Sequence, residues 1–412
     1  MGGGFAGLNV VRALAKAPVV ITLIDHHNHH LFQPLLYQVA TASLNPSDVA
    51  APIRRILRKQ RNVSVLLAQA DSIDLAGRRV VLVDDEVSYD FLVVATGVTH
   101  SYFGNDGWAK HAPGLKTLAD ALAIREKMLF AYEAAERESD PIARQEWLNF
   151  VIVGGGPTGV EMAGSMIEIA RRALDSDFRN YDPRTARVFL VEAGARVLPA
   201  FHPSLSAKAE SQLAKLGVEL RLDSAVTGIN ERGVAIGDER IASRNVIWAA
   251  GIKASSLGAS LVANGGQLDG SGRVKVSPDL SVPGSPEVFV AGDLAAVMNG
   301  SRPVPGVAPA AMQMGKAVAA NIMRSLKGEP TIAFRYRDKG SLATIGRAAA
   351  VADLKRVKLS GLLAWLAWLS IHIFFLIGFR NRTVVMLEWA RAYLGNEWQA
   401  RLITSESSRL RS

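Results

Sequence analysis

Apolar residues in this chain gather in short unbroken runs, several of which end in a glycine or an acidic residue. Unbroken apolar runs between turn-forming residues are typical of buried parallel strands. They predict strands at 19–25, 92–97, 148–153, 188–192, 246–251 and 288–293. Helical patterns cover 8–17, 115 to about 138, and a long segment from residue 160. Residues 258–272 are rich in Gly, Asn, Asp and Ser, which predicts a loop or hairpin.

Two glycine motifs of the form G-x-G-x-x-G stand 152 residues apart in this pattern. This motif is typical of a strand that turns into a helix whose N-terminus faces a pyrophosphate. One copy would be weak support, but two copies, each followed by a strand that ends in an acid, predict two bound dinucleotides. The usual pair is a flavin and a nicotinamide. The residues expected to touch them are Gly2, Gly4, Phe5, Ala6 and Gly7, and then Gly154, Gly156, Pro157, Thr158 and Gly159.

Each motif has an acid at the end of the next predicted strand. Asp25 follows Gly7 by 18 residues, close to the spacing of about 20 expected for a carboxylate that binds ribose hydroxyls. Glu192 has the same place after the second motif, where a carboxylate favours NADH over NADPH. Arg187 and Arg196 are near in sequence and weaken this preference, and a solvated strand-end acid is the alternative. Two further strand ends are expected to line the cofactors, namely Ala95-Thr96-Gly97 and Gly251.

The repeated pattern predicts an α/β protein with two Rossmann-like dinucleotide-binding domains, the second inserted in the first, and a C-terminal membrane-attachment region. The expected bounds are 1–115 with 282–334 for the first dinucleotide-binding domain, 116–281 for the second and 335–412 for the C-terminal region. Only Met1 precedes the first motif, where a central strand is expected. Either the sequence lacks its true start or the first domain lacks a strand, and we favour the first explanation.

Three further features have both a functional and a plain structural explanation. Gly292-Asp293 ends a strand, so that Asp293 either binds the ribityl hydroxyls of a flavin or simply caps a helix. Glu161 lies just after the second motif, and it either complements a helix dipole or stands near the contact of nicotinamide and flavin. The histidine-rich stretch at 26–30 resembles a metal tract, but no other clustered ligands support it, so we expect no metal and a loop beside the flavin.

The composition of the chain limits the kinds of reaction that it can catalyse and the partners that it can bind. The chain of 412 residues is too long for one core, and its 49% hydrophobic content is that of a folded protein. It contains no cysteine, which excludes disulfide exchange, thiolate zinc sites and iron–sulfur clusters, so any redox work falls to bound cofactors. From residue 335 onward, 13 Lys/Arg and 5 Asp/Glu give +8 of the net charge of +9. Since these charges flank an apolar run, we expect an anionic lipid surface rather than nucleic acid as the partner.

The apolar run covers residues 359–379, 21 residues without a formal charge. By length it could span a bilayer as a helix. However, it contains Ser360, Ser370 and His372, and two tryptophans lie well inside it. Because tryptophan prefers the membrane interface, we favour a helix lying in one leaflet. A membrane span and a buried or dimer-forming core helix remain the alternatives.

The motifs together resemble the type II NADH dehydrogenases, single-subunit flavoproteins that pass electrons from NADH to membrane quinone. The resemblance covers essentially the whole chain. The stretches that carry it are 2–8, 29–40 (HHLFQPLLYQVA), 95–97, 112–117 (APGLKT), 154–164, 291–293 (AGD), 306–315 (GVAPAAMQMG) and 339–347 (KGSLATIGR).

This resemblance implies FAD on the first domain, NADH on the second and quinone reached from the membrane side. It implies a peripheral enzyme on the NADH-containing, cytoplasmic face of the membrane, without proton pumping. Gln313 matches a family glutamine near flavin and quinone, whereas Pro309 replaces a second one; Glu161 and Lys339 match positions close to the flavin. The predicted catalytic residues are therefore Glu161, Gln313 and Lys339. A homodimer, a soluble reductase of an electron-carrier protein and a catalytically silent scaffold remain open.

Overall fold

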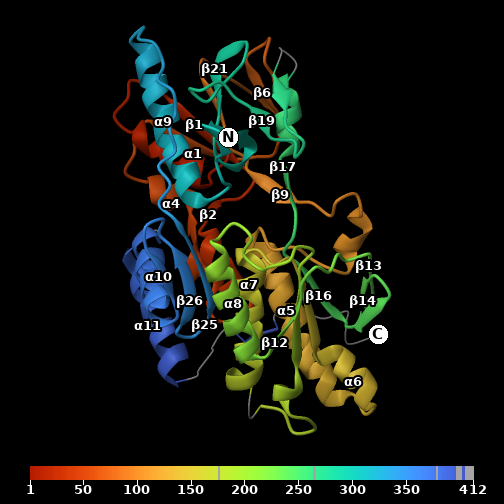
Figure 1. The fold of residues 1–412 in the computed structure, drawn as a ribbon. Coiled ribbons are helices and arrows are strands. Elements are labelled where there is room, and N and C mark those ends of the chain that lie inside the picture. The colour runs from red at the N-terminus through yellow and green to blue at the C-terminus, as the bar shows by residue number, and fades with distance from the viewer. Residues whose placement is uncertain (175–176, 263–265, 377–378, 396–400, 404–412) are drawn as a thin grey trace. The chain divides into compact units, whose positions relative to one another are not determined.

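Figure 1 presents a computed structural model that describes residues 1–412 apart from 175–176, 263–265, 377–378, 396–400 and 404–412. The chain forms two compact units. Unit 1 contains residues 1–31, 50–100 and 252–339, and unit 2 contains residues 32–49, 101–251 and 340–412. Both units combine parallel strands with helices, which confirms the α/β class predicted from the sequence.

Unit 2 is built around a four-stranded parallel sheet in the order β12-β11-β10-β16. All five residues of β10 are buried, because this strand pairs with a neighbour on each edge and is covered on both faces. The strands are β10 (Asn149–Val153), β11 (Arg187–Val191), β12 (Val218–Arg221) and β16 (Asn245–Trp248). The helices of this region are α5 (Leu118–Arg137), α6 (Pro141–Leu148), α7 (Pro157–Glu168) and α8 (Pro203–Leu216).

Two antiparallel sheets and four more helices complete unit 2. One sheet packs against α7 at Gly164, where a side chain would collide with the carbonyl of Ile345. That sheet contains β25 (Ser341–Gly346), β26 (Ala349–Asp353) and β27 (Lys358–Ser360). The other contains β13 (Gly228–Asn230), β14 (Gly233–Ile236) and β15 (Glu239–Ala242). The helices are α2 (Leu36–Ala40), α3 (Pro46–Val49), α10 (Leu362–Phe375) and α11 (Phe379–Gly395).

In unit 1, the backbone of the first residues joins two pairs of parallel strands. β1 (Ile21–Asp25) pairs with β4 (Val63–Leu67), and β8 (Leu92–Val94) pairs with β21 (Ser285–Val290). The amine of Met1 donates to the carbonyl of Val93 at 2.7 Å, and the carbonyl of Met1 accepts from the N–H of Ala95 at 2.9 Å. Gly2 donates to Ile24 of β1 at 2.8 Å. Met1 and Gly2 therefore take the place between β1 and β8 where the sequence predicts a central strand.

The pairing of β21 with β8 confirms that the chain returns to unit 1 after unit 2. Two helices, α1 (Phe5–Ala13) and α9 (Ala308–Leu326), cross closely in this unit. Gly315 permits this approach, since a side chain there would meet the carbonyl of Ala6. The remaining α-helix and strands described in this unit are α4 (Ile53–Leu57), β2 (His29–Leu31), β3 (Ala50–Pro52), β5 (Ala70–Asp74), β6 (Arg79–Leu82), β7 (Glu86–Ser88), β9 (Val98–His100), β17 (Ile252–Ala254), β18 (Gln267–Leu268), β19 (Val274–Lys275), β20 (Ser281–Val282), β22 (Ala295–Ala296), β23 (Met298–Asn299) and β24 (Arg302–Pro303).

Several predicted boundaries are wrong, each for a local reason. α1 and α7 begin before the last glycine of their motifs, because Gly4 and Gly156 are the N-cap residues. The expected loop or hairpin at 258–272 begins as a 3₁₀ helix, Ser256–Val262, and continues as an antiparallel hairpin that pairs Gln267 with Lys275; residues 263–265 lie outside the described residues. The apolar run at 359–379 contributes strand β27 and the 14-residue helix α10 rather than one continuous helix. Among the residues that the structure describes, we find no helix with both the length and the apolar character needed to cross a membrane.

Candidate functional site

The second glycine motif forms a tight turn, named here cradle 2 (Gly154–Gly159 with Glu192). Gly154 has a φ of +113°, and a side chain there would press on the backbone of Ala249 and Ala250 at the end of β16. A side chain on Gly159 would collide with the carbonyl of Gly154. Gly156, the N-cap of α7, has open space where a Cβ would stand. This opening leads to the bare helix N-terminus, where a phosphate can approach the backbone N–H groups.

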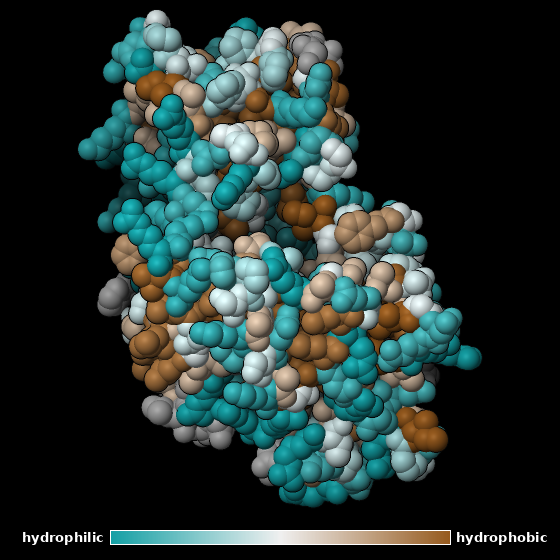
Figure 2. All heavy atoms as spheres, in the orientation of Figure 1, coloured by the Kyte–Doolittle hydropathy of each residue, from teal (hydrophilic) through white to brown (hydrophobic). Residues whose placement is uncertain are grey.

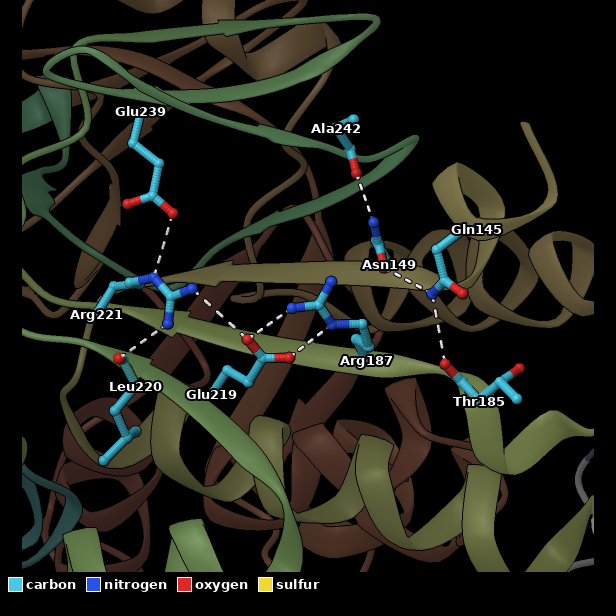
Figure 3. A network of polar contacts seen from close by, with 9 residues as sticks. All are labelled: Gln145, Asn149, Thr185, Arg187, Glu219, Leu220, Arg221, Glu239 and Ala242. Atoms are coloured by element: carbon cyan, nitrogen blue, oxygen red, sulfur yellow. Dashed lines mark hydrogen bonds and ion pairs between the residues drawn. The ribbon is translucent and has the colours of Figure 1, made fainter. Parts of the chain in front are cut away.

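Glu192 holds this turn in place. Its Oε2 accepts a hydrogen bond from the N–H of Gly155 at 2.6 Å, and its Oε1 accepts one from the N–H of Gly194 at 2.8 Å. Each carboxylate oxygen has a second lone pair, so the same group can still accept from ribose hydroxyls. Arg187, by contrast, lies at the opposite end of β11, where Glu219 binds its Nε and Nη2 at 2.6 and 2.8 Å (Figure 3).

The first motif repeats this geometry in unit 1 and is named cradle 1 (Gly2–Gly7 with Asp25). Gly2 has a φ of +89°, and its missing side chain makes room for the carbonyl of Ala95. A side chain on Gly7 would collide with the carbonyl of Gly2, and Gly4 has open space. Asp25 accepts from the N–H of Gly3 at 2.5 Å and from that of His27 at 2.7 Å.

Two polar atoms at cradle 1 have no partner among the described residues. His30 is 2% exposed, and its Nδ1 donates to the carbonyl of Gly3 at 2.9 Å, while its Nε2 has no partner. Burial lowers the pKa of His30, so its ring is neutral at pH 7. The hydroxyl of Thr96, after β8, is likewise buried without a partner. Buried polar atoms are normally paired, so these atoms and the opening at Gly4 fit a polar cofactor in cradle 1.

The other residues predicted at the cofactors lie at strand ends and tight turns. In unit 1, Phe5 begins α1 and its ring meets that of His30 edge-on at 5.0 Å. Gly292 has a φ of +77°, and a side chain there would contact Ala6 of α1. Asp293 follows and lies against Gly306, in the loop before α9. In unit 2, Pro157 and Thr158 open α7, and Gly251 has a φ of +67° with Ser101 beside it. Gly97 of unit 1 has a φ of +68°.

Glu161 lies on α7, in a polar site that also involves β25 and α10. Its Oε1 accepts a long hydrogen bond of 3.4 Å from the N–H of Thr344. Trp368 of α10 is fully buried, and its indole Nε1 has no hydrogen-bond partner among the described residues. Desolvation outweighs the Thr344 contact and raises the pKa of Glu161 to about 8. Glu161 is therefore largely protonated at pH 7, and it can release a proton near neutral pH.

Aromatic and polar side chains continue this site across α10, α11 and α2. His372 stacks on Trp368 with ring centres 4.3 Å apart, and its Nδ1 donates to the carbonyl of Trp368 at 2.7 Å. Burial lowers the pKa of His372 to about 4, so the ring is neutral at pH 7. Trp389 of α11 donates to the buried Gln38 of α2 at 2.7 Å. The stretch HHLFQPLLYQVA thus supplies part of the surroundings of the C-terminal helices.

Gln313 and Lys339, the other predicted catalytic residues, lie in unit 1. Both ends of the Gln313 amide bond the backbone of Arg337: Nε2 donates to the carbonyl and Oε1 accepts from the N–H, each at 3.0 Å. Lys339 is exposed, two residues beyond Arg337. In this structure Gln313 therefore positions the segment that carries Lys339.

The histidine tract forms the predicted loop only in part: residues 26–28 lie in no helix or strand, whereas His29–Leu31 forms strand β2, which pairs with β3. Asp25, His26 and His27 bring three potential metal ligands within 4.8 Å of one another. Both oxygens of Asp25 already accept backbone hydrogen bonds in cradle 1, and we make no metal proposal for this group.

Sequence reasoning missed the residues that surround the predicted ones. Trp368, Thr344 and His372 are far from Glu161 in sequence, and the alternation of apolar residues carries no signal for their meeting. The role of the strand-end acids was only partly foreseen, since Asp25 and Glu192 hold the glycine turn directly. A signal for this role was present: in both motifs the residue between the first two glycines is itself a glycine, Gly3 or Gly155. In cradle 2 a side chain at that position would crowd Glu192.

Two known families match successive parts of the chain. Residues 1–315 match the family described as pyridine nucleotide-disulphide oxidoreductase. Residues 339–396 match the family described as the NDH2 C-terminal domain. The chain has no cysteine, so it cannot use the disulphide chemistry in the first description.

Individual relatives agree with both matches. The chain is 46% identical to the type II NADH:quinone oxidoreductase Ndh of Mycobacterium tuberculosis, over 99% of this chain and 90% of that protein. It is 31% identical to the type II NADH:quinone oxidoreductase of Staphylococcus aureus, over 84% and 86%. The structure of NDH2 from Plasmodium falciparum in complex with NADH has the same fold, with a TM-score of 0.88, 19% identity and 98% of each chain covered.

Proposed function

This chain belongs to the type II NADH:quinone oxidoreductase family, and from that premise we propose that it oxidises NADH and reduces a membrane quinone through FAD. The observation that carries the proposal is the presence of two complete glycine cradles in a protein of this family. The chemistry that a bound flavin supplies is two-electron transfer between a nicotinamide and a quinone.

We assign FAD to cradle 1, in the predicted domain of residues 1–115 and 282–334. The residues present fit this group: Gly4 leaves room for a pyrophosphate, and Thr96 offers an unpartnered hydroxyl. Asp25 holds the turn and has lone pairs left for ribose hydroxyls, and Asp293 lies beside the start of α9.

We assign NADH to cradle 2, in the predicted domain of residues 116–281. Gly156 leaves the N-terminus of α7 open to the pyrophosphate, and Glu192 favours a ribose with a free 2′-hydroxyl. Both arginines that complicated this choice at the sequence level have partners elsewhere. Arg187 is paired with Glu219 at the far end of β11, and Nη2 of Arg196 donates to the carbonyl of Pro199 at 3.0 Å. The local charges therefore favour NADH over NADPH.

Reduction of a quinone to a quinol consumes two protons, and we propose Glu161 as a donor. Its pKa of about 8 means that the carboxyl carries a proton at neutral pH. The N–H of Thr344 bonds the carboxylate after the proton has left, which makes the loss reversible. Gln313 bonds the backbone of Arg337 and so fixes the segment that carries Lys339.

Attachment to the membrane surface is proposed through α10. Four large apolar side chains of this helix are 46–67% exposed, namely Leu362, Leu363, Leu366 and Phe374. Figure 2 shows hydrophobic residues gathered over this helix. Lys355, Arg356 and Lys358 come just before it, where they can meet anionic lipid headgroups. We propose that α10 lies in the leaflet that faces the NADH-containing compartment.

Anaerobic stopped-flow spectroscopy of the purified protein tests the enzymatic proposal. NADH is mixed first and should bleach the flavin absorbance near pH 7; a short-chain quinone is mixed second and should restore it. In Glu161→Gln the first step should be unchanged and the second slower by about 10²-fold, the lower end of what a general acid contributes. Protein that contains FAD but is not bleached by NADH would overturn the proposal.

Vesicle flotation tests membrane attachment. Leu363→Glu/Leu366→Glu should abolish flotation with anionic lipid vesicles, whereas the matched control Ile142→Glu/Leu326→Glu, at exposed apolar residues outside α10, should float as well as the original protein. Equal flotation of both variants would place the lipid contact elsewhere.

A further inference from the structure

Unit 2 contains a pocket of about 680 Å³ that neither cradle accounts for. One wall is a single face of α5, with Ala123, Lys127, Phe130, Ala134 and Arg137 spaced three or four residues apart. The pocket reaches the first residues of β16, so it lies at the amino ends of the parallel strands. Dinucleotides bind at the carboxyl ends of such strands, which makes this pocket distinct from cradle 2.

Positive charge predominates in the pocket lining. Lys110, Lys127, Arg137 and Arg244 line it, against two acids, Glu138 and Glu231. Lys127 donates to the carbonyl of His111 at 2.8 Å. Lys110 and Arg137 are exposed, and within the part of the chain that the structure describes neither has an ion pair or hydrogen bond. The two cations are therefore available to an anion from solution.

Flat rings form another part of the wall. Phe130 and Trp147 meet edge-on with ring centres 5.8 Å apart, and the guanidinium of Arg244 stands 4.5 Å from the centre of the Trp147 ring. An aromatic wall beside free cations is the combination that binds ring-bearing anions. A pocket of this volume holds a ligand the size of a nucleotide.

One polar atom of the lining is left without a partner. Asn149, which begins β10 and does not line the pocket, provides the contrast. Both ends of its side-chain amide are paired, because Nδ2 donates to Ala242 and Oδ1 accepts from Gln145 (Figure 3). Asn245 begins the neighbouring strand β16 and is 2% exposed. Its Nδ2 donates to the carbonyl of Trp147 at 2.6 Å, but its Oδ1 has no partner in the described chain. An unmet buried acceptor costs about 1–3 kcal/mol, which a donor on a ligand would recover.

We propose that this pocket is a second small-molecule site, which binds a nucleotide-like anion. The ring lies against Phe130 and Trp147, the phosphate groups bind Lys110 and Arg137, and an amino group on the ring supplies the donor that Asn245 lacks. ADP combines these features, and it is the probe of choice. The proposal is independent of the electron-transfer reaction, since it concerns binding only.

Isothermal titration calorimetry on the full-length protein loaded with FAD tests the site. NAD⁺ is kept at saturation to fill cradle 2, and ADP is titrated in. We expect one further ADP to bind per chain. Adenosine lacks the phosphates and pyrophosphate lacks the nucleoside, so each should bind at least about tenfold more weakly than ADP, which corresponds to 1.4 kcal/mol. Absence of heat up to millimolar ADP overturns the proposal, as does pyrophosphate binding as tightly as ADP.

A matched pair of variants locates the binding. Arg137 and Lys215 are both exposed cations in the last turn of a helix, but only Arg137 lines the pocket. Arg137→Glu should weaken ADP binding by at least about tenfold, whereas Lys215→Glu should leave it within about twofold. Equal weakening in both variants assigns the effect to net charge and overturns the site. If Arg137→Glu does not fold, Lys110→Glu replaces it, because Lys110 is exposed at the end of a short 3₁₀ helix.

Discussion

Cradle 1 and cradle 2 form the same turn, but the backbone that pairs beside each turn differs. In both, the first and last glycines avoid a collision with backbone, the third glycine stays open, and a strand-end acid holds the second. Cradle 2 continues from β10, a fully buried strand with partners on both edges. In cradle 1, Met1 bonds the backbone of Val93 and Ala95, and Gly2 bonds Ile24 of β1. In both cradles, glycines and a carboxylate hold the geometry of the turn.

The helices that follow the two cradles carry different side chains at one equivalent position. Asn9 of α1 corresponds to Glu161 of α7, since the motifs are offset by 152 residues. Asn9 simply donates to the carbonyl of Phe5 in its own helix at 2.8 Å. Glu161 instead faces β25 and Trp368, and its carboxyl is held protonated at pH 7. Two similar folds thus support different chemistry, because different elements cover their helices.

Substitution of the last glycine should break either cradle and separate their roles. Gly7→Ala and Gly159→Ala each force a Cβ into a backbone carbonyl, which costs about 3 kcal/mol or roughly 100-fold in cofactor affinity. Gly7→Ala should lose its yellow colour, whereas Gly159→Ala should stay yellow but resist bleaching by NADH. The flavin-to-protein absorbance ratio and a NADH titration measure the two effects. Loss of FAD from Gly159→Ala alone would reverse our assignment of the cradles.

The open glycines give a milder and more specific test. Nothing lies where a Cβ would stand on Gly4 or Gly156, so alanine there should reduce the free energy of unfolding by less than about 1 kcal/mol. A phosphate must approach through the same space, and affinity should fall about tenfold, or 1.4 kcal/mol. Thermal melting without cofactor and titration with cofactor separate the two quantities. Equal affinity after substitution would mean that the phosphate binds elsewhere.

The acid of cradle 2 should govern the choice of nicotinamide. Glu192→Arg replaces a charge that repels a 2′-phosphate with one that attracts it, so the ratio of NADPH to NADH use should rise about tenfold. The variant also loses the hydrogen bonds to Gly155 and Gly194, so activity with both cofactors should fall. Asp238→Arg, an exposed acid at a strand connection, is the matched control. An unchanged ratio would refute the ribose assignment.

The last expected effect is a change in pH dependence at Glu161. A folded-state pKa of about 8 lies above the usual 4.5, so the folded protein binds more protons than the unfolded chain between these values. The contribution of Glu161 to stability is thus present below pH 4.5 and is lost as the pH rises toward 8. Glu161→Gln should flatten the stability curve across this window, as measured by denaturant unfolding from pH 5 to 8.5. Glu133→Gln, an exposed glutamate of α5, should leave the slope unchanged.

The sequence predicted those features that depend on short stretches of chain. The strands around both motifs, the glycine turns and their acids all follow from local patterns, and the α/β class follows from their repetition. It did not predict what packs on α7, because Gly164 meets Ile345 only after the chain has passed through the whole of unit 2. The pocket beside Trp147 was missed for a similar reason: its lining comes from five separate stretches whose residues are unremarkable one by one.

Unit 1 is formed by segments that lie far apart in the chain, and this has a consequence for folding during synthesis. β8 ends at Val94, but its parallel neighbour β21 begins only at Ser285. A ribosome therefore completes the sheet of unit 2 (β16 ends at Trp248) before the first sheet has all its strands. During that interval the early strands expose unpaired edges, the condition in which nascent chains aggregate or recruit chaperones. Slower translation between these two points lengthens the time during which these edges are unpaired.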